Sequence, residues 1–146
     1  MKIATFRSDG RDVLGFVDGD AILDLAAAQK KPGSANLPTT MVELIAKAPA
    51  SLDGLRSLAA KTPKNDAASW RPLASTQLLS PIPHPTKNVF CVGRNYKAHI
   101  EEGARARNLE VVFPQAPEFF SKPPTSVIGH RGTIRLDPKV TTSPSL

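Results

Sequence analysis

The stretch KNVFCVGRNYKAHIEEG, residues 87–103, predicts a strand that ends in a loop rich in functional side chains. The apolar run Val89–Val92 stops at Gly93, and polar groups follow it directly. Rigid apolar support with clustered polar groups at its end is typical of a strand that carries a binding or catalytic loop. The groups are a cation, an amide, a phenol, an imidazole and two carboxylates, from Arg94, Asn95, Tyr96, His99, Glu101 and Glu102.

The spacing of His99 and Glu102 fits a hydrogen-bonded pair of imidazole and carboxylate. If a short helix is capped by Asn95 and ends before Gly103, the two side chains lie three positions apart on one helix face. A carboxylate bonded to one ring nitrogen makes the other nitrogen a better base, which can activate water or accept a proton. A solvated helix with a salt-bridged histidine has the same spacing, so the residues alone leave both interpretations open.

Length and composition limit the chain to one domain, or to a small domain with part of another. Its 146 residues are 40% hydrophobic and 22% charged, which is enough apolar content for a core and unlike a disordered chain. Fourteen prolines, many of them after Pro81, argue against a helical bundle. They predict turn-rich β structure in the second half of the chain.

The net charge of +6 is concentrated in the second half of the chain. Residues 86–146 carry nine Lys and Arg against five Asp and Glu, a net charge of +4. These cations are scattered singly and have no stacking aromatic residues between them, so we do not expect nucleic acid as the partner. An acidic partner and a pocket for small anionic molecules both stay open for such a surface.

The sequence predicts a cytoplasmic protein that does not associate with membranes. Its single cysteine, Cys91, permits no intramolecular disulfide, which is typical of a reducing compartment. The first ten residues, MKIATFRSDG, lack the apolar core of a signal peptide. No stretch approaches the roughly 20 apolar residues of a membrane-spanning helix.

Residues 1–80 predict a small α+β domain in which a β-meander precedes two helices. The strands are expected at residues 2–7, 13–17 and 21–25, separated by turns that contain Asp-Gly. Thr40 and Glu43 have the spacing of a capping box, so a first helix begins there and Pro49 ends it. A second helical period covers residues 51–61.

Residues 81–86 predict an extended linker, because alternating prolines remove backbone donors and disfavour helix. Residues 87–146 then form the beginning of a second, mostly β domain. Short strands are expected at residues 127–129 and 133–136.

Two motifs resemble the fumarylacetoacetate hydrolase family: NVFCVGRNYKAHIEEG at residues 88–103 and EFFSKPPTSVIG at residues 118–129. Bacterial members carry a CVGxNYxxHxxE-like segment at the end of a strand, followed by an F(F)xKPxTxxxG segment. The order and spacing of the two segments match here. The resemblance is close over residues 80–146 and loose before them.

The resemblance implies a mixed-sheet, hydrolase-type second domain and a metal-dependent chemistry. Members use Mg²⁺ or Mn²⁺ to polarise an oxygen of a 2-oxo acid or a β-diketone such as an acylpyruvate. They cleave C–C bonds, decarboxylate, hydrate or isomerise. The implied substrate is a small anionic molecule, and the implied full-length protein is a homodimer.

The resemblance also implies roles for four residues of this chain. His99 and Glu102 match the pair that activates water in the hydrolases of the family. Arg94 and Lys122 fall within the matching motifs and are suitable cations for a substrate carboxylate.

One departure from the family pattern concerns the metal ligands. The family's ligands are carboxylates of an ExE-like segment and a later Asp, all downstream of the KPxT motif, and hard divalent cations need such oxygens. After Glu118 this sequence has a single carboxylate, Asp137. We therefore expect the chain to be the N-terminal part, a fragment, of a longer enzyme, with its metal ligands elsewhere and no catalysis by itself.

Two other functions stay open at this point. The chain could be a non-catalytic module of the same ancestry that binds a small anion or a partner. It could also be a basic nucleic-acid-binding domain, whose affinity for DNA would fall steeply with salt.

Overall fold

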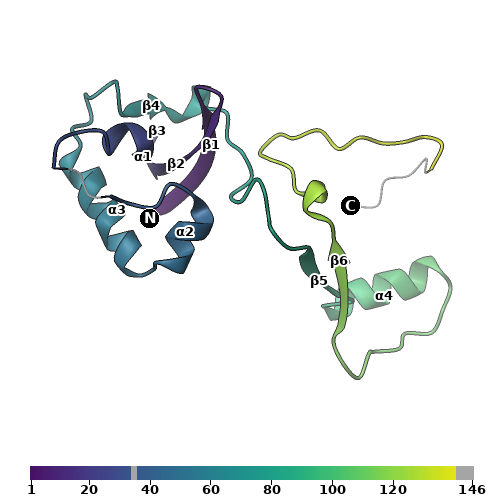
Figure 1. Cartoon of the computed structure of the whole chain (residues 1–146). Coiled ribbons are helices and arrows are strands. Elements are labelled where there is room, and N and C mark those ends of the chain that lie inside the picture. Colours follow the sequence, from purple (N-terminus) through teal and green to yellow (C-terminus); the bar gives the residue numbers. More distant parts are fainter. Residues whose placement is uncertain (34–35, 141–146) are drawn as a thin grey trace. The chain divides into compact units, whose positions relative to one another are not determined.

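The computed structural model describes residues 1–33 and 36–140, and its architecture is α+β, as predicted (Figure 1). The chain divides into two compact units. Residues 1–83 with 128–140 form one, here called the N-terminal unit, and residues 84–127 form the other, here called the ribbon unit. The division into residues 1–80, 81–86 and 87–146 stays a prediction.

The N-terminal unit is built on the predicted antiparallel meander. Its four-stranded sheet has the order β1 (Lys2–Ser8), β2 (Arg11–Asp18), β3 (Ala21–Asp24), β4 (Trp70–Pro72). In the turn between β1 and β2, Asp9 and Gly10 both have positive φ, 49° and 76°. Two-residue hairpin turns of matching twist require this conformation, which Asp-Gly adopts readily.

The helices α2 (Met41–Ala46) and α3 (Ala50–Lys61) confirm the two that were predicted. Thr40 caps α2, because its Oγ1 accepts a hydrogen bond from the Glu43 backbone N–H at 3.2 Å. The Glu43 carboxylate reaches back and accepts from the Thr39 N–H, also at 3.2 Å. Two shorter elements were not predicted, because their sequences have no periodic pattern: α1 (Leu25–Ala28) and the 3-10 turn η1 (Leu73–Ser75).

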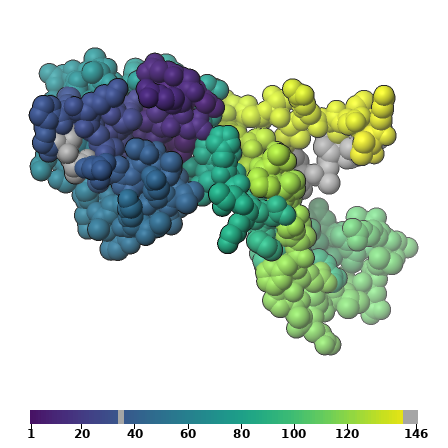
Figure 2. All heavy atoms as spheres, viewed as in Figure 1, coloured from purple at the N-terminus to yellow at the C-terminus, as the bar shows by residue number. Residues whose placement is uncertain are grey.

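The core of the N-terminal unit lies where α2 and α3 pack on the sheet. Leu14 and Leu23 from the sheet meet Leu44 and Leu55 from the helices, and all four are at most 1% exposed. Trp70 of β4 belongs to the same cluster. Figure 2 shows the strands and helices of this unit, in purple through blue to teal, as a closely packed mass of atoms.

The ribbon unit holds a separate two-stranded antiparallel sheet. Along the chain, β5 (Val89–Gly93) comes first, then the helix α4 (Lys97–Ala106), and then β6 (Glu118–Lys122), which pairs with β5. The 3-10 turn η2 (Pro124–Ser126) follows β6. Phe90 is 75% exposed, and β6 is exposed along its whole length. Within residues 84–127, Ile100 is the one hydrophobic side chain that is buried. The apolar run Val89–Val92, which was expected to support the loop, is therefore largely exposed.

The strands predicted at residues 127–129 and 133–136 are wrong, because the described chain has no strand there. The backbone turns instead: the Gly132 N–H donates to the Gly129 carbonyl at 3.0 Å, and Arg131 between them has a φ of 59°. A strand needs a hydrogen-bonded neighbour, and an apolar alternation alone does not supply one. None of the helices in residues 1–33 and 36–140 has the length and apolar character needed to cross a membrane.

Candidate active site

The pair of strands β5 and β6 is here called the ribbon. Its end positions the first candidate residue, Arg94. Gly93 of β5 pairs with Glu118 of β6, and the chain leaves the sheet at the next residue. Arg94 has a φ of 45°, in the left-handed region that few non-glycine residues adopt. Its backbone therefore turns sharply out of β5.

Arg94 and Glu118 form a two-pronged ion pair across the end of the ribbon. The Arg94 Nε donates to Glu118 Oε2 at 2.7 Å, and Arg94 Nη2 donates to Glu118 Oε1. These hydrogen bonds lower the pKa of the Glu118 carboxyl and raise the pKa of the Arg94 guanidinium. Both side chains remain nearly half exposed, so the pair is screened by water.

The helix after Arg94 begins and ends later than its predicted caps. Its N-cap is Tyr96 rather than Asn95, and the Tyr96 carbonyl accepts from the backbone N–H groups of His99 and Ile100 at 3.1 and 3.3 Å. Gly103 lies inside the helix rather than beyond it. Alanines around Gly103 favour helix and offset the roughly 1 kcal/mol that an interior glycine costs.

His99 lies in the first turn of α4 with its ring against that of Tyr96. The ring centroids are 5.3 Å apart and the planes are tilted by 39°. Glu102 lies three residues on in the same helix, as predicted, but no hydrogen bond joins the two side chains in the described structure. The acid–imidazole pair therefore stays a prediction. Glu101 instead faces Lys97, with an Nζ–Oε1 distance of 3.6 Å.

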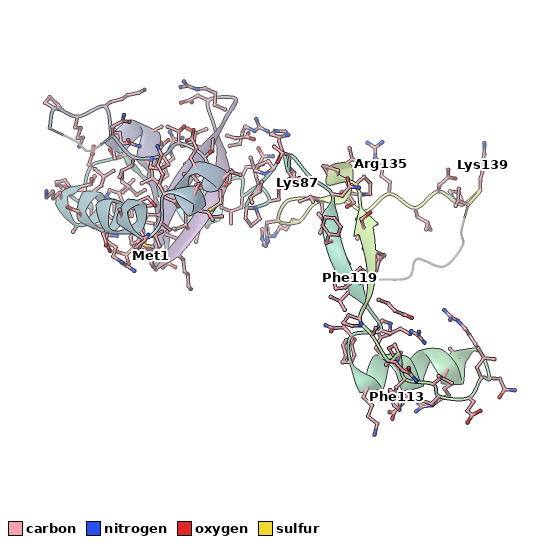
Figure 3. All side chains as sticks on the ribbon, turned by 60° about the horizontal axis from the view of Figure 1, so that its bottom comes forward. Met1, Lys87, Phe113, Phe119, Arg135 and Lys139 are labelled. Carbon is pink, nitrogen blue, oxygen red and sulfur yellow. The ribbon has the colours of Figure 1, made fainter. Side chains whose placement is uncertain are left out.

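Two hollows in the ribbon unit share Arg94 as a lining residue. The smaller hollow, of about 290 Å³, also contains His99 and Arg107, and is here called the imidazole hollow. The larger one, of about 560 Å³, is lined by Glu118 and by side chains from the loop before β6. Figure 3 shows Phe113 of that loop beside α4, and Phe113 and Ile100 line the larger hollow together.

The structure brings two of the four candidate residues together. Arg94 and His99 line the imidazole hollow, whereas Glu102 and Lys122 line neither of the two hollows just described. Lys122 lies at the opposite end of β6 from Glu118, about 13 Å away at the usual rise per residue of a strand. Its role as a second substrate cation stays a prediction.

Sequence reasoning missed three polar residues of this region: Arg107, Glu110 and Glu118. Arg107 follows α4, and Glu110 lies in the loop beyond it; both line the imidazole hollow. Glu118 is 24 positions from its partner Arg94, too far for a helical spacing rule to connect them. The signal that connects them is the register of β5 against β6, which sets Glu118 opposite Gly93, the neighbour of Arg94 in the chain.

The residues present do not fit a divalent metal. Across residues 1–33 and 36–140, no three His, Cys, Asp or Glu side chains come close enough together to hold an ion. Hard cations such as Mg²⁺ need several oxygen ligands, and the Glu118 carboxylate is already held by Arg94. The side chains that line the imidazole hollow can still bind an anion and transfer a proton.

Comparison with known proteins gives matches in both halves of the chain. Residues 88–143 match the family model described as "Fumarylacetoacetate (FAA) hydrolase C-terminal". Over 147 aligned positions, 97% of the chain is 35% identical to "Oxaloacetate tautomerase YisK" of Bacillus subtilis. A shorter stretch, 51% of the chain, is 43% identical over 76 positions to the Mycobacterium tuberculosis protein Rv2993c. The chain spans 47% of the length of the first relative and 25% of the second.

Proposed function

The chain belongs to the fumarylacetoacetate hydrolase family, and on that premise we propose that it supplies the substrate-carboxylate site of an enzyme acting on a 2-oxo acid. One observation carries the proposal: a guanidinium and an imidazole, Arg94 and His99, line a single hollow. A guanidinium is the preferred partner of a carboxylate, and an imidazole is the side chain best suited to move a proton near neutral pH.

The proposed chemistry is proton transfer next to a bound carboxylate. Arg94 binds the substrate carboxylate and so fixes the molecule beside α4. His99 then takes a proton from the carbon next to the oxo group, and a proton returns to the oxo oxygen, which converts the keto form to the enol with no net change in protons. Glu102, three residues on in α4, stabilises the protonated imidazole once a rotamer change brings the two together.

Isomerisation is favoured here over C–C hydrolysis, decarboxylation or hydration. The relative that aligns along nearly the whole chain carries the name of an oxaloacetate tautomerase. Tautomerisation needs one acid–base group and a held carboxylate, whereas hydrolysis needs an activated water as well. If water-activating hydrolysis is the reaction instead, His99 and Glu102 take the roles first expected of them.

A metal ion stays part of the proposal only as a property of the family, whose members commonly use divalent metals. The described residues hold no suitable ligand set for such an ion, so the proposed proton transfer depends on His99 and Arg94 alone. A non-catalytic module that binds an anion is the second candidate function. The missing hydrogen bond between His99 and Glu102 in the described structure favours it.

Binding of oxalate, a small dicarboxylate related to 2-oxo acids, tests the proposal on the chain itself. In a titration followed by amide chemical shifts, we expect saturable shifts around the imidazole hollow. Arg94→Ala should weaken oxalate binding about tenfold, because it removes a charged, two-pronged contact. Arg105→Ala is the matched control, since Arg105 lies on α4 but does not line the imidazole hollow. Equal losses in the two variants would mean that the anion senses only net charge.

Turnover separates the enzyme from the binding module, because the proposed proton transfer uses side chains of this chain alone. The expectation of no catalysis by the chain itself applied to the metal-dependent chemistry. Conversion of oxaloacetate between its keto and enol forms can be followed by ultraviolet absorbance, with His99→Ala as the test variant. Binding of oxalate with no conversion above the buffer rate would favour the module. Conversion that disappears in His99→Ala would favour the enzyme.

A further inference from the structure

We propose that Glu118 is a positioning residue, which holds the Arg94 guanidinium from one side so that its other N–H groups face a substrate carboxylate. The inference rests on the proposed function, because it takes Arg94 as the group that binds the carboxylate. Glu118 is the first residue of the second matching motif, but the resemblance assigned it no role.

The atoms used in the ion pair decide which donors of Arg94 stay available. A guanidinium has five N–H groups, one on Nε and two on each terminal nitrogen. Glu118 takes the Nε–H and one hydrogen of Nη2, which lie along one edge of the group. Both hydrogens of Nη1 and one of Nη2 remain, and a second carboxylate can accept from these two nitrogens end-on.

The lining residues of the two hollows place Glu118 on the side away from the ligand. Glu118 and Arg94 both line the larger hollow, whereas Arg94 lines the imidazole hollow without Glu118. The Glu118 carboxylate therefore holds Arg94 from the larger hollow, and the imidazole hollow stays open to an anion. A substrate bound next to His99 does not need to displace Glu118.

The backbone explains why Arg94 needs such support. It lies just beyond the end of β5, with a positive φ, and its side chain is nearly half exposed. A long side chain on an exposed turn loses conformational freedom when it binds a ligand, and that loss weakens binding. Glu118 is fixed in the facing strand, opposite Gly93, so it orders the guanidinium before the ligand arrives.

A positioning role and a purely electrostatic role predict opposite effects of removing Glu118. If Glu118 acts only as a negative charge near the site, its removal strengthens binding of an anion. If it positions Arg94, its removal weakens binding despite the gain in positive charge. The sign of the change in oxalate affinity therefore distinguishes the two roles.

The experiment compares Glu118→Ala with Glu101→Ala in the full chain, using oxalate as the probe. Both variants remove one negative charge from an ion pair of the ribbon unit, and Glu101 lines neither hollow. We expect Glu118→Ala to bind oxalate about fivefold more weakly than Glu101→Ala, and Glu118→Gln to fall between them because its amide oxygen still accepts one hydrogen bond.

A spectroscopic signal reports the position of Arg94 without any ligand. Its Nε–H resonance should be resolved in the unmodified chain and in Glu101→Ala, and should merge with those of free arginines in Glu118→Ala. The amide spectrum of each variant verifies that the ribbon unit is still folded.

The outcomes separate the two proposals. Equal or tighter oxalate binding by Glu118→Ala than by Glu101→Ala would overturn the positioning role and leave the proposed function standing. Absence of saturable oxalate binding by the unmodified chain would overturn both. Weaker binding together with loss of the Arg94 signal supports the assignment.

Discussion

Asp24 bonds three separate parts of the N-terminal unit while only 3% of it is exposed. Its Oδ1 accepts from the Ala27 N–H at 2.9 Å, which caps α1. Its Oδ2 accepts from Ser8 Oγ at 3.2 Å and from Arg71 Nη2 at 3.1 Å, so β1 and β4 meet at the same carboxylate. One buried side chain thus connects the first strand, the first helix and the last strand of the sheet.

Removing the Asp24 carboxylate should destabilise the N-terminal unit and leave the structure of the ribbon unit unchanged. We expect Asp24→Ala to lower the free energy of unfolding by about 2–4 kcal/mol, because it leaves buried donors without an acceptor and deletes a helix cap. Asp24→Asn should cost less, since its amide oxygen can still accept from Ala27. Urea unfolding followed by Trp70 fluorescence measures both changes. Equal midpoints for the two variants would contradict the role given to the hydrogen bonds.

Contacts between residues a few positions apart in the sequence were predicted well, and contacts between distant residues were not predicted. Thr40 and Glu43 are three positions apart, and both capping contacts expected of such a box have close counterparts in the structure. Arg94 and Glu118 are separated by 24 positions, and only the pairing of β5 with β6 brings them together. The candidate site was therefore found in part, as a set of polar groups after a strand, but not the contact that orders it.

Among the elements, α4 runs past its predicted end, because Gly103 was expected to end it. The helix continues through Gly103 to Ala106, and a Cβ at this position would meet nothing within 4 Å. A glycine stops a helix when the backbone turns left-handed there, and here a positive φ first appears at Asn108, with 54°. Sequence alone could not tell which of the two positions would make the turn.

Gly103→Ala should therefore stabilise α4 by about 0.5–1 kcal/mol, since alanine loses less backbone entropy in a helix. Amide hydrogen exchange of the α4 residues measures the gain as slower exchange. Gly54→Ala in α3 is the matched control, because a Cβ there would lie 2.6 Å from Leu37 Cδ2 and force that side chain to move. If both substitutions slow exchange in their own helices equally, the free space around Gly103 does not determine the gain in helix stability.

The two units of the molecule differ in how their elements are held together. Residues 1–83 of the N-terminal unit bury a shared cluster from strands and helices, and their hydrophobic periodicities predicted the three meander strands and the two longer helices. Residues 128–140 of the same unit form no strand and add no side chain to that cluster. The ribbon unit has the same kinds of residues but leaves most of them exposed. Periodicity predicts which face of an element is apolar, not whether another element covers that face, so strands were wrongly expected beyond residue 126.

One face of the ribbon consists of apolar side chains that no other element covers in the described structure. Phe90 and Val92 of β5 lie two positions apart and therefore on one face of the strand, and Phe119 of β6 pairs with Val92 on the same face. Phe90 and Phe119 are 75% and 68% exposed. A two-stranded ribbon is marginally stable alone in water, and both of its outer edges have unpaired backbone groups. Association is the simplest way for such a ribbon to bury its apolar face.

We therefore expect the chain to self-associate as its concentration rises, with the ribbon as the contact. Phe90→Ser and Phe119→Ser together should move association to about tenfold higher concentration, because each removes apolar surface that would be buried, at about 25 cal/mol per Å². Val140→Ser is the control, since Val140 is 81% exposed but lies outside the ribbon unit. Sedimentation velocity over a dilution series measures the shift. A chain that stays monomeric at every concentration, or that responds equally to Val140→Ser, would show that the exposed ribbon does not drive contact between copies.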